Sequence, residues 1–257
     1  MQTAKLGIET YMLRDEMDAD LCGTLAKLKS FGYEGLELWA HHYGQDIGFL
    51  REHIKESGLA VASWHTDMAM LVEDLDAVIA ANRAVNCQSI VINQLPPLAC
   101  YSGDAVIAAA RLFDSLTARL EDIGMHLGFH NFNPDSFADR GGITPWHHFC
   151  DHCDPRFFMQ LDVCMAAKAN QNIPALILRT GERLKSTHMK PYTYGASTKL
   201  GGYEPMIGED SLDYTAIRNA CESVHVEWHL VEYEERTRYT PIYAAELCLE
   251  RLRERGF

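Results

Sequence analysis

The sequence predicts an α/β protein with one domain, a single (β/α)8 TIM barrel that spans residues 1–257. Strand-like apolar runs alternate with helix-like amphipathic runs, which is typical of parallel strands joined by helical crossovers. Eight units of each kind can be placed, and 257 residues is an ordinary length for a closed barrel. An open doubly wound sheet would alternate in the same way. However, neither a G-x-G-x-x-G nor a Walker A sequence follows the first strand.

The first half of the chain supplies four of these units. Asp18-Ala19-Asp20 can cap a first helix of apolar residues at helical spacing, which Gly32 then ends. Gly58 stops the next helix in the same manner. The expected strands are 6–12, 35–39, 59–64 and 89–93, and the later helices are 46–57, 72–85 and 104–122.

The second half repeats the order of strand and helix. The expected strands are 125–130, 157–162, 184–188 and 229–232, and the expected helices are 145–153, 172–181, 213–223 and 241–255. Two connections, 131–144 and 190–210, are long and rich in glycine and aromatic residues. Long loops of this kind at a barrel rim are typical of substrate walls or lids.

Four strands of the second half end on residues able to bind a divalent metal. They are His130, Asp162, His188 and Glu232. Carboxylate and imidazole groups are ligands for Mg²⁺, Mn²⁺, Co²⁺ and Zn²⁺. All strand ends of a parallel barrel open onto one face, so we expect these four residues to form one site.

Composition limits the possible partners and the compartment. The formal charge of −13 repels the phosphates of nucleic acid, so no nucleic-acid partner is expected. No apolar run is long enough to span a membrane, and the first residues lack a secretory signal pattern. We therefore expect a cytoplasmic protein with no membrane partner and with its eight cysteines reduced. Whether the chain forms a homo-oligomer is left open by the sequence.

The chain resembles the xylose isomerase-like TIM barrel family, the group of sugar phosphate isomerases and epimerases. The similarity lies in residues 7–15, 31–38, 58–65, 128–131, 160–163, 188–190 and 230–232, in order along the chain. The resemblance implies a divalent metal, most often Mn²⁺, with Mg²⁺, Co²⁺ or Zn²⁺ as alternatives, and a small sugar or polyol substrate. It also implies ligands of the order Glu, Asp, His and Glu from strands five to eight.

Three positions depart from the pattern of the family. His130-Asn131 stands where the ligand Glu of the fifth strand is expected. Pro191 replaces an Asp that many relatives carry, and Asp135 stands where Glu is common. These departures put the reaction in doubt and leave the barrel prediction intact.

Catalysis next to a sugar carbonyl passes through an enediolate that a metal stabilises as a Lewis acid, and it requires a nearby base. Glu232 is the first candidate base, His130 is a second base or a ligand, and Lys190 is a candidate to neutralise an oxyanion. The residues expected to contact substrate are Tyr11, Glu37, His65, Asn93 and Trp64. Glu37 and His65 have an alternative role, which is to pair with neighbours at a polar barrel mouth.

Three functions follow from these residues. The first is a metal-dependent sugar isomerase or epimerase that abstracts a proton beside a carbonyl. The second is a lyase or dehydratase that acts on a keto-inositol or a 3-keto-glycoside, because a single His base beside a metal suits β-elimination equally well. The third is a non-catalytic sugar-binding subunit that keeps the barrel and lacks part of the site.

Overall fold

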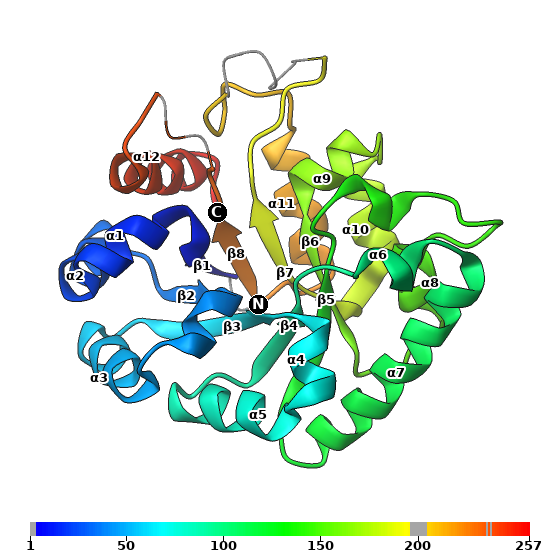
Figure 1. Ribbon diagram of the computed structural model, residues 1–257. Helices are drawn as coiled ribbons and strands as arrows, with labels where there is room; N and C mark the ends of the chain where they lie inside the picture. Colours follow the sequence, from blue (N-terminus) through cyan, green and yellow to red (C-terminus); the bar gives the residue numbers. More distant parts are fainter. Residues whose placement is uncertain (1–3, 196–204, 235, 237) are drawn as a thin grey trace.

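The computed structural model describes residues 4–195, 205–234, 236 and 238–257. Eight parallel strands close into a barrel in the order β1 to β8, and β8 pairs with β1 (Figure 1). Helices surround the barrel on its outside (Figure 1). The predicted (β/α)8 barrel is therefore confirmed. Residues 196–204 of the long connection after β7 lie outside the described residues.

The strands lie close to their predicted positions. Their bounds are β1 Lys5–Glu9, β2 Gly35–Leu38, β3 Ala60–Thr66, β4 Ser89–Ile92, β5 His126–His130, β6 Phe158–Asp162, β7 Leu184–Met189 and β8 Trp228–Val231. The first strand was predicted to reach Met12, and this prediction is wrong. The chain turns at Thr10 into a 3-10 helix, η1 (Thr10–Leu13), because the side chain of Glu9 accepts a hydrogen bond from the backbone N–H of Tyr11.

The helices of the first half are α1 Arg14–Ala19, α2 Leu21–Phe31, α3 Ile47–Ser57, α4 Met68–Glu73, α5 Leu75–Ala84, α6 Pro97–Cys100 and α7 Gly103–Glu121. Those of the second half are α8 Pro145–His152, α9 Val163–Lys168, α10 Ile173–Thr180, α11 Tyr214–Ser223 and α12 Pro241–Glu254. Short 3-10 helices lie at η2 Ala40–Gly44, η3 Pro134–Phe137 and η4 Gly181–Arg183. The helix predicted at 72–85 is divided at Asp74, whose side chain caps α5 through the N–H of Ala77.

The predicted helix ends rest on residues that satisfy free backbone groups. Asp20 caps α2 through the N–H of Gly23, and Asp46 caps α3 through the N–H of Phe49. Gly32 and Gly58 end these helices with φ angles of 100° and 67°, which glycine adopts without strain. Among the described residues, no helix is long and apolar enough to cross a bilayer.

The interior of the barrel changes from apolar to polar along its axis. Near the start of the strands, Phe158 of β6 packs against Gly128 of β5, and Trp228 of β8 reaches across β1 to Gly35 of β2. A Cβ on Gly128 would collide with the ring of Phe158, and one on Gly35 would lie 2.6 Å from the ring of Trp228. Toward the carboxyl ends, the buried side chains become carboxylates and imidazoles. The candidate site therefore lies at the open end, on a packed apolar floor.

Candidate metal and substrate site

Three predicted metal ligands converge at the mouth of the barrel. Asp162 ends β6, His188 is paired with it on β7, and Glu232 follows β8. One ligand atom from each lies within 4.8 Å of the other two, and all three side chains are buried. This arrangement results from the period of two in strands, which points Asp162, His188 and Glu232 to the barrel interior.

Asp162 is held in place through its backbone. The side chain of Asn131 donates to the carbonyl oxygen of Asp162 at 3.1 Å and accepts from its N–H at 2.7 Å. One carboxylate oxygen, Oδ1, caps α9 by accepting from the N–H of Met165. The predicted His130-Asn131 pair therefore contributes through its Asn, which ties the ends of β5 and β6 together.

Opposite charges alternate through the centre of the site. His188 lies between two carboxylates, with Nε2 at 2.5 Å from Glu37 Oε1 and Nδ1 at 2.7 Å from Glu232 Oε2. Lys190 Nζ lies 2.7 Å from the other oxygen of Glu232 and 2.8 Å from Glu234. Burial favours the neutral form of His188, but Glu37 and Glu232 overcome this effect and raise its pKa well above the usual range.

The acidic groups outnumber the cations that balance them. Burial opposes ionisation of Glu232, yet Lys190 and His188 hold its pKa well below the usual range. Asp162 is less compensated, because burial raises its pKa to about 6 and the charge of Glu232 adds to this rise. Burial also raises the pKa of Glu9 well above normal, with Glu232 and Glu37 as further causes. A divalent cation would supply the missing positive charge, so the residues present fit a metal.

His130 belongs to a second group, formed by the imidazoles of His65, His130 and His188. Its ring centroid is 4.4 Å from that of His188 and 5.0 Å from that of His65. Burial lowers the pKa of His130 well below normal, and the two other imidazoles add to this shift. Its Nδ1 atom is buried and makes no hydrogen bond with the described residues. Of the four predicted ligands, Asp162, His188 and Glu232 thus form one close group. His130 instead joins His188 and His65 in the second group.

A cavity of about 280 Å³ opens above these residues. Three of the five predicted substrate contacts line it, namely Tyr11, His65 and Asn93. Trp39 forms a further wall, with the ring of Tyr11 edge-on at 5.1 Å. The described lining contains the carboxylates Glu9, Asp67, Glu232 and Glu234 and neither Lys nor Arg.

The other two predicted substrate contacts, Trp64 and Glu37, do not line this cavity. Trp64 is fully buried beneath the rim, where its ring stacks on Tyr43 at 4.2 Å. Glu37 is also fully buried, and its two oxygens are taken up by protein donors such as Gln160 Nε2 at 2.5 Å. Trp64 neighbours the cavity-lining His65 and therefore points to the opposite face of β3, whereas Glu37 points inward but lies one layer beneath the cavity.

Glu9 is a member of the site that the sequence analysis missed. It ends β1, lines the cavity and is 3% exposed. Its Oε1 accepts from Tyr11, whereas the buried Oε2 has no hydrogen-bond partner among the described residues. The signal was an apolar run that ends on a carboxylate, as at Asp162 and Glu232. Extending the first strand to Met12 concealed it.

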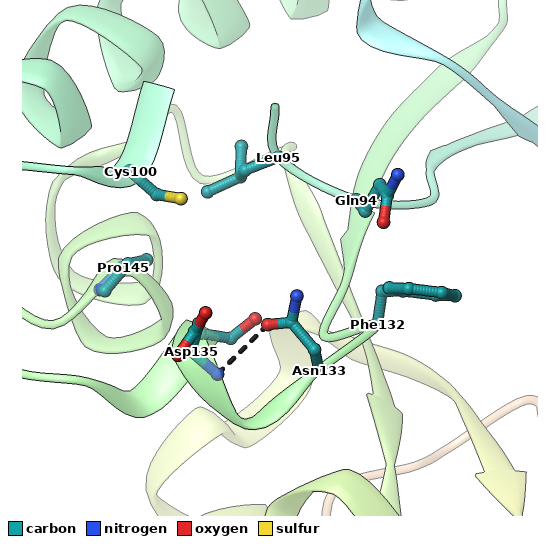
Figure 2. A pocket seen from close by; sticks show the side chains of 8 residues that line it. Gln94, Leu95, Cys100, Phe132, Asn133, Asp135 and Pro145 are labelled. Carbon is teal, nitrogen blue, oxygen red and sulfur yellow. Dashed lines mark hydrogen bonds between the residues drawn. The ribbon is translucent and has the colours of Figure 1, made fainter. Parts of the chain in front are cut away.

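A separate hollow of about 10 Å³ lies between the loops that follow β4 and β5, with room for about one water molecule. Figure 2 shows Asp135 in this hollow, close to Asn133, whose side-chain oxygen accepts from the N–H of Asp135 at 3.0 Å. Asp135, which stands where the family often has Glu, is therefore part of neither metal-ligand group formed by the described residues.

Solved structures share this architecture. A sugar phosphate isomerase/epimerase from Parabacteroides distasonis superposes with a TM-score of 0.81 at 17% identity, covering 100% of this chain and 96% of its own. A D-allulose 3-epimerase from Methylomonas gives a TM-score of 0.70 at 13% identity, with 99% of each chain covered. A probable 3-DHS dehydratase from Bacillus anthracis gives 0.74 at 12%, covering 97% of this chain and 98% of its own.

The fold is that of the xylose isomerase-like TIM barrels. At these identities the likeness establishes the fold alone. The matched structures belong to the same group of proteins that the sequence resembles. No protein-family profile matches the chain, and no curated protein matches it significantly. What the site can do chemically therefore follows from its own residues.

Proposed function

We propose that this protein is a divalent-metal-dependent isomerase or epimerase of free sugars, which moves a proton next to a carbonyl through an enediolate. The observation that carries the proposal is the convergence of Asp162, His188 and Glu232 within 4.8 Å beside a cavity. Two carboxylates and one imidazole suit several divalent metals, and among Mn²⁺, Mg²⁺, Co²⁺ and Zn²⁺ the family resemblance favours Mn²⁺. When bound, the metal supplies Lewis-acid stabilisation of negative charge on the substrate oxygens.

The residues of the chain supply the proton chemistry. Glu232 is ionised beside Lys190, so it can accept the proton from a substrate carbon. The ammonium group of Lys190 balances the negative charge of Glu232. His130 is neutral and lines the cavity, so it can exchange a proton with a substrate oxygen. Tyr11, His65, Asn93 and Glu9 line the cavity and can bind hydroxyl groups.

The cavity favours a small neutral substrate. Its volume lies near the lower end of the range for small-molecule sites, which suits a single sugar or polyol. The acidic lining repels phosphate and carboxylate groups, and Lys190 is already paired with Glu232 and Glu234. We therefore propose a free sugar rather than a sugar phosphate.

The experiment is a proton-exchange assay on metal-depleted protein reloaded with Mn²⁺, Mg²⁺, Co²⁺ or Zn²⁺. A panel of free ketoses and aldoses is incubated in D₂O, and NMR follows the loss of the C–H signal beside the carbonyl. D162N should lower exchange by at least about a hundredfold, because it removes a metal ligand while Asn still caps α9. Sugar binding without exchange under any of the four metals would instead support a non-catalytic sugar-binding subunit.

A lyase is the second candidate, and His130 is the observation that favours it. A neutral imidazole that lines the cavity suits loss of water or of an aglycone from a keto-inositol or a 3-keto-glycoside. The two reactions leave different products. A new enone or diketone absorbance identifies the lyase, and C–H exchange without that absorbance identifies the isomerase.

A further inference from the structure

Glu37 is a buried carboxylate that the proposed proton chemistry does not use. It lies on β2 beneath the cavity, and its side chain is fully buried. Burial of an ionised carboxylate costs several kcal/mol unless protein donors surround it. Its presence therefore requires a reason in its contacts.

Every contact of the Glu37 carboxylate is with a donor from another strand. Oε1 lies 2.5 Å from His188 Nε2 and 3.0 Å from His65 Nε2, while Oε2 accepts from Gln160 Nε2 and from the hydroxyl of Ser63. These donors come from β3, β6 and β7. Glu37 thus ties three strands together at the level directly beneath the proposed metal ligands.

The contact with His188 has a chemical consequence. An ionised carboxylate only accepts hydrogen bonds, so Nε2 of His188 carries a hydrogen that it donates to Glu37. The other ring nitrogen, Nδ1, is thereby turned toward Glu232, 2.7 Å away, and toward the group that includes Asp162. Nδ1 also faces a carboxylate and donates to Glu232. A metal bound beside Glu232 would take the place of that hydrogen, whereas Nε2 would stay engaged by Glu37.

We propose that Glu37 is a positioning residue, which fixes the ring of His188 so that Nδ1 is the nitrogen presented to the metal. This inference rests on the proposed metal site. Glu37 acts on the metal through His188 and never contacts substrate. Its negative charge also makes Nδ1 a stronger donor, as a carboxylate behind a metal-bound histidine does.

The test measures Co²⁺ and Mn²⁺ affinity by calorimetry on metal-depleted protein, without reference to turnover. E37Q should bind these ions 10- to 100-fold more weakly, the usual effect of removing a carboxylate behind a ligand histidine. The matched control is S63A, which removes another partner of the same carboxylate without touching His188 and should leave the affinity unchanged. The visible spectrum of bound Co²⁺ gives a second measurement, because it changes if His188 no longer coordinates.

The outcomes separate the role of Glu37 from the existence of the metal site. Equal affinities and equal Co²⁺ spectra for E37Q and the unmodified protein overturn the role of Glu37 and leave the proposed metal site standing. Absence of binding in the unmodified protein overturns both. If E37Q does not fold, as judged by circular dichroism, E37D replaces it, since a shorter carboxylate keeps the charge but not the 2.5 Å contact. E37D should then bind Co²⁺ more weakly than S63A, and equal binding overturns the role.

Discussion

At the scale of single residues, Lys190 should limit how strongly the proposed metal site attracts a cation. Its ammonium group lies 2.7 Å from Glu232 and acts electrostatically on Asp162, so it repels a dication at the same carboxylates. K190M should therefore bind Mn²⁺ more tightly, by about tenfold or about 1.4 kcal/mol. Calorimetry on metal-depleted protein measures this change.

The control for this prediction lies on the same strand. Lys185 pairs with Glu227 at 3.2 Å near the start of β7, far along the strand from the ligands. K185M makes the same change in net charge and should leave Mn²⁺ affinity unaltered. A weaker affinity in K190M would mean that Lys190 chiefly keeps Glu232 in position.

His229 makes stability depend on pH outside the site. Burial lowers its pKa from 6.5 to about 3 in the folded protein. The unfolded chain takes up this proton below about pH 6.5 and the folded chain does not, so acidification stabilises the unfolded state. From pH 7.5 to 5.0 this one residue should cost about 2 kcal/mol.

Urea unfolding at the two pH values measures this loss. H229Q keeps a partner for Thr187, whose hydroxyl lies 2.8 Å from His229 Nδ1, but it has no titratable proton. Its free energy of unfolding should therefore fall by about 2 kcal/mol less than that of the unmodified protein over the same interval. An identical fall in both proteins would contradict the assignment.

Residue by residue, the sequence predicted which side chains converge better than it predicted what surrounds them. Asp162, His188 and Glu232 were found because each ends an apolar run, and strand ends converge in any parallel barrel. Glu37 was assigned to substrate because proximity to a strand end does not reveal depth, and Trp64 because it does not reveal which face of the strand a side chain takes. Whether a side chain lines the cavity or lies one layer beneath depends on the stagger of the strands.

At the scale of elements, strand β5 depends on a glycine. A Cβ on Gly128 would collide with the ring of Phe158 on β6, and that ring is itself buried. G128A should therefore lower the free energy of unfolding by about 1–3 kcal/mol through overpacking. Gly44 provides the control, because a Cβ there meets no atom within 4 Å. Chemical denaturation of G128A and G44A compares the two sites, and equal stabilities would show that the barrel floor adjusts to the extra methyl group.

Element existence was easier to predict than element ends. Asp20, Asp46, Gly32 and Gly58 mark helix ends in the sequence and cap the same helices in the structure. The short helices α6 and α9 were missed, since four to six residues are too few to establish a helical period. Helix α9 starts at Asp162 itself, so a proposed ligand also serves as a helix cap.

At the scale of the whole molecule, the order of strands was fully predictable and the reaction was not. Alternating runs, short connections and the right-handed crossover rule leave few arrangements other than the closed barrel β1 to β8. The reaction depends on which atoms remain without partners. Those atoms, such as Oε2 of Glu9 and Nδ1 of His130, are defined only after every strand has taken its register.

The net charge of −13 belongs to the whole molecule, and any cation could stabilise so acidic a protein by screening the repulsion between its carboxylates. A specific site behaves differently. At one hundred times its Kd, Mn²⁺ should add about 2.7 kcal/mol to the free energy of unfolding. For a chain of this length, that gain raises Tm by about 5–10 °C.

Thermal unfolding with MnCl₂, compared with NaCl at equal ionic strength, separates these two effects. D162N should lose the rise specific to Mn²⁺, because it removes a carboxylate from the group of three ligands. E52Q, on the exposed side of α3, makes the same change in net charge and should keep the full rise. Equal rises in D162N and E52Q would mean that Mn²⁺ acts on the acidic surface at large, and the mouth of the barrel would then have no special affinity for a metal.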